Sequence, residues 1–125
     1  DEALTLLARV GLGGRAQVPA GALAHGEQRQ LEVALALASR PRLLLLDEPM
    51  AGMGPDESER MVRLIAGLKG RVTIVLVEHD MDAVFRLADR ISVLVYGRVL
   101  ATGTPAEIRA NADVRQAYLG SEAVR

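Results

Sequence analysis

The stretch LLLLDEPMAG, residues 43–52, places two carboxylates, Asp47 and Glu48, directly after four leucines. A continuous apolar run of this length is typical of a strand that is covered on both faces, because no polar residue alternates with the leucines. The two acids then follow the carboxyl end of that strand, which is the edge where ligands bind in an open α/β sheet. The stretch therefore predicts either a magnesium–nucleotide site or an ion pair that ends a strand.

Composition limits the classes of protein to consider. The 125 residues suffice for one small domain or for part of a larger one, and 50% of them are hydrophobic. A net charge of −1 without a stripe of lysine and arginine argues against a nucleic-acid-binding surface. The absence of cysteine suits a reducing cytoplasm, and no apolar run approaches the roughly 20 residues of a membrane span. The acidic start of the chain is unlike a signal peptide.

Hydrophobic periodicity predicts alternating helices and strands. The i, i+3, i+4, i+7 spacing predicts amphipathic helices over residues 31–38, 61–68 and 81–88. Short continuous apolar runs predict strands over residues 43–46, 72–77 and 91–95. This alternation indicates an α/β fold with a mostly parallel sheet that is flanked by helices.

The two ends of the chain carry further signals. Residues 1–10 are predicted to be helical and are followed by a connector rich in Gly, Pro and Ala. A turn at residues 96–98 predicts a C-terminal β-hairpin with a short strand at 99–101. The sequence TPAE from Thr104 resembles a capping box and predicts a helix start, and a last helix is expected over 113–119, ending at Gly120.

Two more stretches place polar residues where elements begin or end. LAHGEQ, residues 23–28, leads directly into a helix, and a glycine there leaves backbone N–H groups able to meet a phosphate. VEHD, residues 77–80, follows an apolar strand, and its histidine can donate a hydrogen bond to a phosphate or polarise a water. Each stretch taken alone also fits an ordinary helix start or a capping residue.

Taken together, these segments resemble the C-terminal half of an ATP-binding cassette (ABC) ATPase. The resemblance rests on their order along the chain, which is LAHGEQ, a helix, LLLLDEP, a helix, a strand and EHD. The resemblance covers nearly the whole chain. It implies that residues 43–47 are the Walker B strand and that Asp47 holds Mg²⁺, usually through water. It also implies that Glu48 is the general base of ATP hydrolysis and that His79 is the switch histidine that contacts the γ-phosphate.

The same resemblance implies two segments that act across a dimer. The signature motif, usually LSGGQ, contacts the γ-phosphate of ATP held by the opposite subunit, and it matches Leu23, Ala24, His25, Gly26 and Glu27. The D-loop crosses the dimer interface, and it matches Met50, Ala51, Gly52, Met53 and Gly54. Ala24 stands where the family usually has serine and Gly54 where it usually has aspartate. We therefore expect a weakened contact to the γ-phosphate and altered hydrogen bonding between subunits.

A closer resemblance is to the ATPases of bacterial branched-chain amino acid importers, on LAHGEQRQLEVALALA, DEPMAGMGPDE, EHDMDAVFRLADRISVL, YGRVLATGTPAEIRAN and VRQAYLG. It implies ATP and Mg²⁺ as cofactors, a second ATPase subunit in a head-to-tail dimer, integral-membrane permease subunits and, indirectly, a periplasmic solute-binding protein. The implied location is cytoplasmic, on the inner face of the cell membrane. The alternatives are an importer of urea, amides or other amino acids, a non-transport ABC ATPase, and a non-catalytic interaction module.

Two family elements have no match in these residues. Nothing fits the phosphate-binding pattern G-x-x-x-x-G-K-[ST], and Gln17 lies too near the signature motif to be the Q-loop glutamine. We therefore expect a fragment that is inactive alone and that self-associates through an open sheet edge or apolar face. The expected organisation is the end of a helical subdomain with its connector (1–22), the ATPase core (23–103) and a C-terminal helical tail (104–125).

Overall fold

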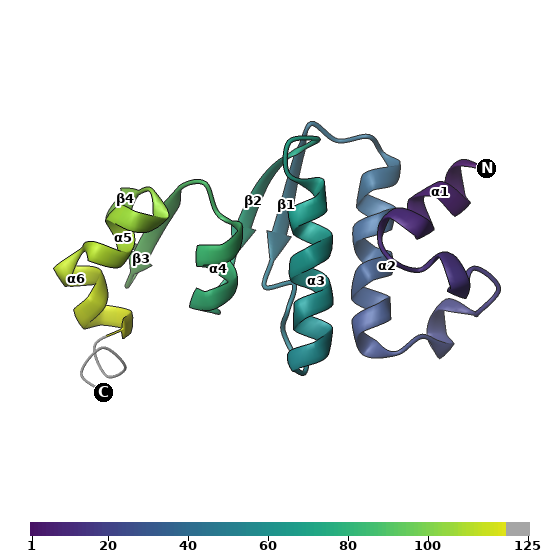
Figure 1. Cartoon of the computed structure of the whole chain (residues 1–125), viewed down its shortest axis with the longest axis horizontal. Helices are drawn as coiled ribbons and strands as arrows, with labels where there is room; N and C mark the ends of the chain where they lie inside the picture. Colours follow the sequence, from purple (N-terminus) through teal and green to yellow (C-terminus); the bar gives the residue numbers. More distant parts are fainter. Residues whose placement is uncertain (120–125) are drawn as a thin grey trace. The chain divides into compact units, whose positions relative to one another are not determined.

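The computed structural model describes residues 1–119, which form two compact units on either side of the junction between His79 and Asp80. The first unit contains α1 (Glu2–Arg9), the 3₁₀ turns η1 (Gly13–Arg15) and η2 (Ala20–Ala22), α2 (His25–Ala38), β1 (Leu43–Asp47), α3 (Pro55–Leu68) and β2 (Thr73–Val77) (Figure 1). The second unit contains α4 (Met81–Leu87), β3 (Ile91–Val95), β4 (Arg98–Gly103), α5 (Pro105–Ala110), α6 (Ala112–Val114) and the π-helical turn η3 (Arg115–Leu119). The predicted boundaries at residues 22 and 103 stay a prediction.

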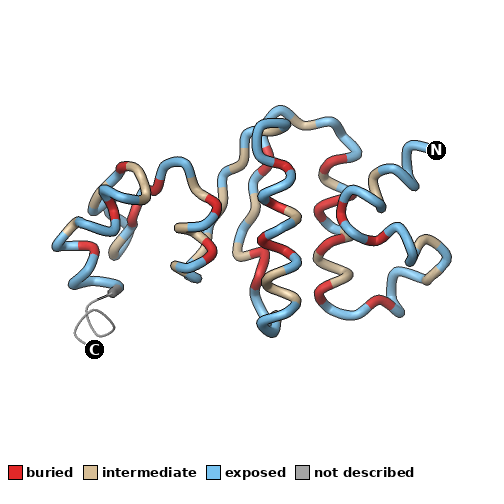
Figure 2. The backbone as a smooth tube through the Cα atoms, viewed as in Figure 1, coloured by how far each residue is buried: buried red, intermediate tan, exposed pale blue. Residues whose placement is uncertain are grey.

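A parallel strand pair forms the centre of the first unit. β1 and β2 pair in register from Leu43 opposite Thr73 to Asp47 opposite Val77. Helices α2 and α3 contribute buried residues to the core beside this pair, and Figure 2 shows such positions recurring along both helices. The main apolar ones are Val33, Ala34, Leu37, Met61, Val62, Ile65 and Leu68. The predicted parallel β–α–β arrangement is therefore present for these two strands.

The two faces of this strand pair differ, which corrects the expectation that both are covered. Leu44 is 4% exposed, whereas its neighbour Leu45 is 68% exposed. Alternate side chains of a strand point to opposite faces, and Leu43, Val75 and Val77 are also exposed. The helices of the first unit thus cover one face only. We call the other face, formed by residues 43, 45, 47, 73, 75 and 77, the open face.

The N-terminal helix and connector are attached to α2 by a buried amide. Asp1 caps α1 by accepting a hydrogen bond from the Ala3 N–H at 2.9 Å. Val10 follows α1 directly. Its carbonyl accepts a hydrogen bond from the side chain of Gln30, in α2, at 2.8 Å. Gln30 is the one polar residue among the buried side chains of the described chain. The predicted helix over 1–10 is confirmed.

The second unit is built on an antiparallel hairpin. β3 and β4 are joined by Tyr96 and Gly97, whose φ angles of 49° and 75° are those of a tight type I′ turn. Its core contains Ile91, Val93, Ile108 and Val114. The predicted hairpin is confirmed, but β3 does not extend the parallel sheet, because its hydrogen-bonding partner is β4. The parallel part of the described chain therefore has two strands.

The helix that follows the hairpin begins as the sequence predicts. Thr104 Oγ1 accepts a hydrogen bond from the Glu107 N–H at 3.2 Å, and Pro105 occupies the first helical position. Asn111 caps the next short helix in the same way. The predicted helix end at Gly120 lies outside the described residues.

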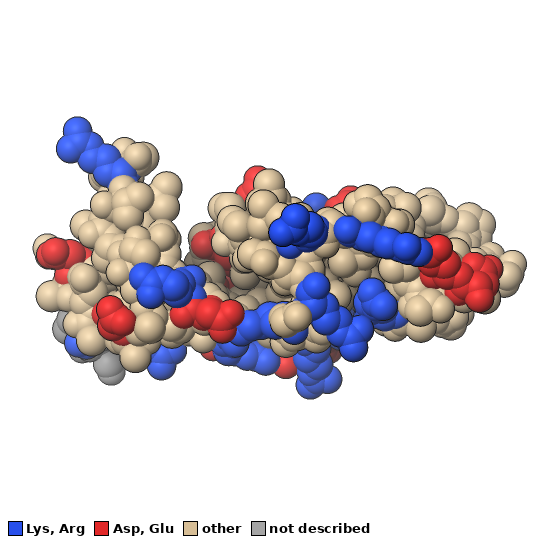
Figure 3. Space-filling view, turned by 90° about the horizontal axis from the view of Figure 1, so that it is seen from above, with Lys and Arg blue, Asp and Glu red and all other residues tan. Residues whose placement is uncertain are grey.

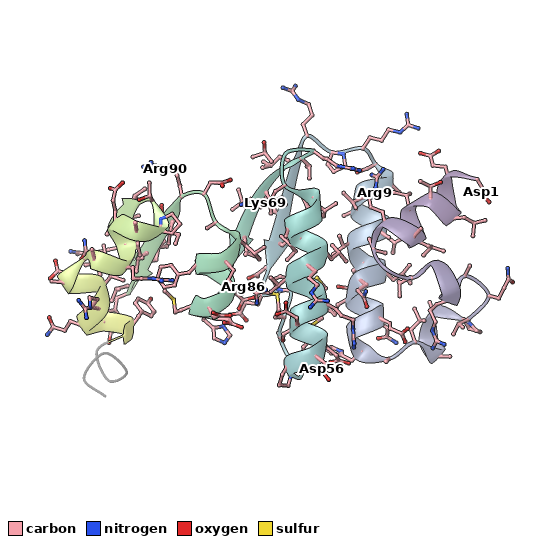
Figure 4. All side chains as sticks on the ribbon, viewed as in Figure 1. Asp1, Arg9, Asp56, Lys69, Arg86 and Arg90 are labelled. Carbon is pink, nitrogen blue, oxygen red and sulfur yellow. The ribbon has the colours of Figure 1, made fainter. Side chains whose placement is uncertain are left out.

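The charged surface is mixed. Figure 3 shows lysine and arginine side chains in several groups with acidic side chains between them. In α3, acidic residues occupy the first turn and Lys69 follows the last, as the helix dipole favours; Asp56 and Lys69 mark these ends in Figure 4. No helix in the described part of the chain has both the length and the apolar character needed to cross a membrane.

Because Leu44 is buried and Leu45 is exposed, replacing each by alanine should lower the free energy of unfolding by different amounts. Leu44→Ala should lower the free energy of unfolding by about 2–5 kcal/mol, because it leaves a cavity under α2 and α3. The matched control Leu45→Ala should cost less than about 1 kcal/mol, because that side chain is mostly in water already. Urea unfolding followed by circular dichroism measures both. Equal costs would show that the open face is covered in solution.

Candidate functional site

Parallel pairing brings the residues that follow β1 and β2 to the same edge. The Glu48 N–H donates to the Val77 carbonyl at 2.8 Å, one step beyond the last paired residues. The carboxylate of Glu48 and the ring of His79 then meet, with 2.8 Å between Glu48 Oε1 and His79 Nδ1. Both side chains are reachable from solvent, at 45% and 75% exposure. The structure thus brings together the two residues that the sequence assigned to catalysis.

The backbone of Glu48 has an unusual conformation. Its φ angle is 45°, in the left-handed region that residues other than glycine rarely adopt. Its carbonyl accepts hydrogen bonds from the Ala51 N–H at 3.1 Å and from Arg29 Nη2 at 2.9 Å. Such backbone conformations persist where surrounding contacts hold them, and they occur often at functional sites.

Asp47 lies at the end of β1 on the open face and is exposed. No group of three His, Asp or Glu side chains among the described residues is arranged to hold a metal. Mg²⁺ usually keeps several waters and binds one or two protein carboxylates together with substrate phosphates. A single accessible carboxylate at a strand end fits that donor set.

The segment expected to be the signature motif forms the start of α2. Leu23 is buried, while Ala24 and His25 are exposed. The Glu27 carboxylate accepts a hydrogen bond from the Ala24 N–H at 3.1 Å and pairs with Arg15 Nε at 2.9 Å. Glu27 therefore stabilises this helix start from within the chain, although Ala24 has no side-chain acceptor for a cap.

Gly26 is packed more tightly than a free phosphate-binding glycine. It is buried, and a Cβ atom at this position would lie 3.1 Å from Glu57 Cδ in the first turn of α3. The absence of a side chain at Gly26 therefore leaves room for the Glu57 side chain. Contact of residues 23–27 with a phosphate stays a prediction.

The segment expected to be the D-loop connects β1 to α3 and contacts the start of α2. Met50 is buried, and the turn continues through exposed Ala51 and Gly52. His25 Nε2 lies 3.2 Å from the Ala51 carbonyl oxygen. A Cβ atom on Gly52, whose φ is 75°, would lie 3.2 Å from the same His25 nitrogen. The two segments expected to act across a dimer thus touch each other within one chain.

Sequence reasoning missed three residues of this region: Arg15, Arg29 and Glu57. Arg15 and Glu57 act on the helix start through contacts that no local pattern encodes. For Arg29 a signal was present, because it lies four residues after His25 and hence on the same face of α2. Its target, the Glu48 carbonyl, could not be inferred without the geometry of the turn.

Two family models match the chain. One described as "ABC transporter" matches residues 1–51, and one described as "Branched-chain amino acid ATP-binding cassette transporter" matches residues 98–124. The high-affinity branched-chain amino acid transport ATP-binding protein LivG of Salmonella typhimurium is 48% identical over 122 residues, which are 96% of this chain and 48% of that protein. The protein BraF of Pseudomonas aeruginosa, which has the same description, is 50% identical over 103 residues, 81% of this chain and 40% of BraF.

A solved structure resembles the fold over the same extent. The ADP conformation of MJ1267, an ATP-binding cassette of an ABC transporter, superposes with a TM-score of 0.82 at 26% identity, covering 95% of this chain and 49% of that one. This likeness confirms the predicted fold class. The chain spans about half the length of the curated relatives that it matches.

The left-handed backbone of Gly52 predicts a specific sensitivity to a side chain. Gly52→Ala should lower the free energy of unfolding by about 1 kcal/mol or more, because alanine is strained at this φ and would crowd His25. Gly21→Ala is the matched control, because Gly21 lies outside the left-handed region and has no atom within 4 Å of its Cβ position; it should not lower the free energy of unfolding. Urea unfolding compares the two. Equal effects would contradict the observed turn geometry.

Proposed function

Because the chain belongs to the ABC transporter family of ATP-binding subunits, we propose that it forms the C-terminal half of an ATP-hydrolysing subunit of a bacterial importer. The observation that carries this proposal is the 2.8 Å contact between Glu48 and His79 beside Asp47, at the carboxyl edge of a parallel strand pair. A carboxylate and an imidazole held together at this edge suit the activation of water next to a nucleotide.

Glu48 is the general base in this proposal. Its half-exposed carboxylate can orient a water and take its proton as the water oxygen attacks the γ-phosphorus of ATP and ADP departs. The bond from His79 Nδ1 holds one carboxylate oxygen in place. The other ring nitrogen of His79 would then be available to contact the γ-phosphate.

Asp47 would hold Mg²⁺, usually through water. The ion would neutralise charge on the phosphates as the β–γ bond breaks. The carboxylate of Asp47 projects from the last residue of β1 onto the accessible open face, one residue before the proposed base. The metal ligand and the base therefore follow each other directly at the strand end.

Residues 23–27 and 50–54 are proposed to act on the opposite subunit in a head-to-tail dimer. Exposed Ala24 and His25 would face the γ-phosphate of ATP held by that subunit, and exposed Ala51 and Gly52 would reach across the interface. Integral-membrane permease subunits would be the further partners, with a periplasmic solute-binding protein acting indirectly. The subunit would then lie on the cytoplasmic face of the membrane.

The proposed solute is a branched-chain amino acid. The support is the match of residues 98–124 to the branched-chain amino acid transporter model, together with the identities of 48% and 50% to LivG and BraF. Uptake of radiolabelled leucine tests the proposed solute. The assay uses cells that lack their own importer of branched-chain amino acids. Uptake of urea or an amide instead would overturn the solute and leave the ATPase proposal standing.

A phosphate-binding loop outside these residues is proposed to hold the β- and γ-phosphates, because no G-x-x-x-x-G-K-[ST] pattern occurs in the chain. The 125-residue chain alone should then show no heat of binding in calorimetric titration with Mg-ATP up to about 1 mM, since that loop supplies most of the phosphate contacts. Micromolar binding would contradict this and would direct attention to the start of α2.

Replacing the proposed base should separate hydrolysis from binding. In the full-length ATPase, Glu48→Gln should lower turnover by about 100-fold or more and leave ATP bound in a stable dimer, because the amide cannot take a proton. Phosphate release and size-exclusion chromatography measure the two effects. Asp113→Asn, an exposed acid in α6, is the control and should behave as wild type. Unchanged turnover in Glu48→Gln would remove Glu48 from the role of base.

Replacing the histidine should weaken hydrolysis less severely. His79→Ala in the full-length ATPase should lower turnover by about tenfold or more, because Glu48 loses a charge-assisted hydrogen bond and the γ-phosphate loses a contact. Steady-state phosphate release measures it, with the same Asp113→Asn control. A near-normal rate would make the contact between His79 and Glu48 merely structural.

A further inference from the structure

We infer that Arg29 of α2 is a positioning residue for ATP hydrolysis, because it holds the backbone from which the Glu48 carboxylate projects. The inference rests on the function proposed above, in which Glu48 is the general base. Arg29 donates from Nη2 to the Glu48 carbonyl at 2.9 Å across 19 residues of sequence. Its side chain is partly buried, at 28% exposure, so this charged hydrogen bond is only partly open to water.

The residue that Arg29 holds has a backbone conformation that needs surrounding contacts to persist. The φ of 45° at Glu48 is unfavourable for a residue with a side chain, and it sets the direction in which the carboxylate leaves the strand. The N–H of Glu48 is fixed to Val77 by the strand ladder, which leaves the carbonyl side to be fixed by the turn. On that side the Glu48 carbonyl oxygen accepts hydrogen bonds from the Ala51 N–H and from the Arg29 guanidinium. Removing Arg29 leaves one weaker donor at this carbonyl.

A second side chain on the same face of α2 reaches the same turn. His25 precedes Arg29 by one helical turn and contacts the Ala51 carbonyl at 3.2 Å. The helix therefore holds the 48–51 turn at its first and last residues, through two side chains that contact backbone oxygens. A displacement of the start of α2 would be transmitted to Glu48 through these contacts. Since His25 also lies in the segment proposed to face the opposite subunit, this gives that segment a physical connection to the base.

The other contact of Arg29 does not account for its placement. Arg29 Nη1 pairs with Glu32 Oε2 at 3.3 Å, one turn along α2, where the glutamate is 64% exposed. Exposed ion pairs of this kind contribute little to stability. Arg29 Nε is buried and has no hydrogen-bond partner among the described residues. The bond to the Glu48 carbonyl is the shorter of the two hydrogen bonds that the guanidinium makes with the described residues.

The test uses steady-state ATP hydrolysis by the full-length protein. Arg29→Met keeps the apolar stem and removes the donors; it should lower kcat by about 10- to 100-fold, because a small misplacement of a catalytic group has effects of this size. The KM for ATP should stay within about twofold, because Arg29 touches the base rather than the nucleotide. Arg29→Lys should recover part of the loss, since one ammonium can still reach the carbonyl.

Two matched controls separate this role from general effects of charge. Glu32→Gln removes the exposed partner of Arg29 and should leave kcat unchanged. Arg63→Met removes an exposed arginine that pairs with Glu59 on α3 and should also leave kcat unchanged. In a Glu48→Gln background, Arg29→Met should cause no further loss, because the base through which Arg29 acts is already gone. A kcat for Arg29→Met equal to wild type, or a loss that persists undiminished without Glu48, would overturn the inference.

A second readout distinguishes failure of the inference from failure of the proposed function. If the wild-type protein hydrolyses no ATP, the proposed function fails, and the positioning contact is then judged by amide hydrogen exchange in the 125-residue chain. Arg29→Met and Arg29→Lys should speed exchange of the Ala51 N–H, which donates to the same carbonyl, with the larger effect for Met. The controls Glu32→Gln and Arg63→Met should not. Unchanged exchange at Ala51 in both Arg29 variants would overturn the contact itself.

Discussion

The hydrogen bond from the Glu48 N–H to the Val77 carbonyl extends the parallel ladder of β1 and β2 one step into the site. It fixes the point at which the segments after β1 and β2 leave the sheet, and so it brings Glu48 within 2.8 Å of His79 across 31 residues of sequence. This register in turn depends on hydrophobic patterning. A slip of one residue would move Leu44 to the exposed face and Leu45 into the core, together with every other side chain of the strand. The burial of Leu44 and the meeting of Glu48 with His79 are therefore two consequences of one pairing.

Helix α2 connects this core to the turn. His25, Arg29, Val33 and Leu37 follow each other at intervals of four and so form one ridge along the helix. The two later residues are buried in the core of the first unit, while the two earlier ones contact backbone oxygens of the 48–51 turn. Because the apolar part of the ridge fixes the rotation of the helix, it also fixes where the polar part can reach. Packing in the core thereby sets the position of the proposed base.

Sequence patterns predicted where helices and strands form better than they predicted which segments pack against them. LLLLDEP predicted β1 with acids at its end, and TPAE predicted the cap at Thr104, because both signals are local and depend on few neighbours. The separation of β3 from the parallel pair and the identity of the exposed face of β1 were not predicted, because an apolar run indicates what can be buried and not which segment covers it. The resemblance implied separate roles for Glu48 and His79, and their contact became visible only in the structure; the role of Arg29 required the left-handed turn at Glu48 to be known.

The position of Asp47 connects the open face to the chemistry proposed for the site. Residues 43, 45 and 47 point to the same face of β1, so an element that covers Leu43 and Leu45 also approaches the Asp47 carboxylate. Such an element would remove water from two leucines and from the valines opposite them, and it would lower the dielectric around Asp47 in the same step. Electrostatic attraction between that carboxylate and a cation grows as water is excluded. Burial of the apolar face and a stronger hold on a cation at Asp47 are therefore expected to occur together, because the alternation of a single strand places them side by side.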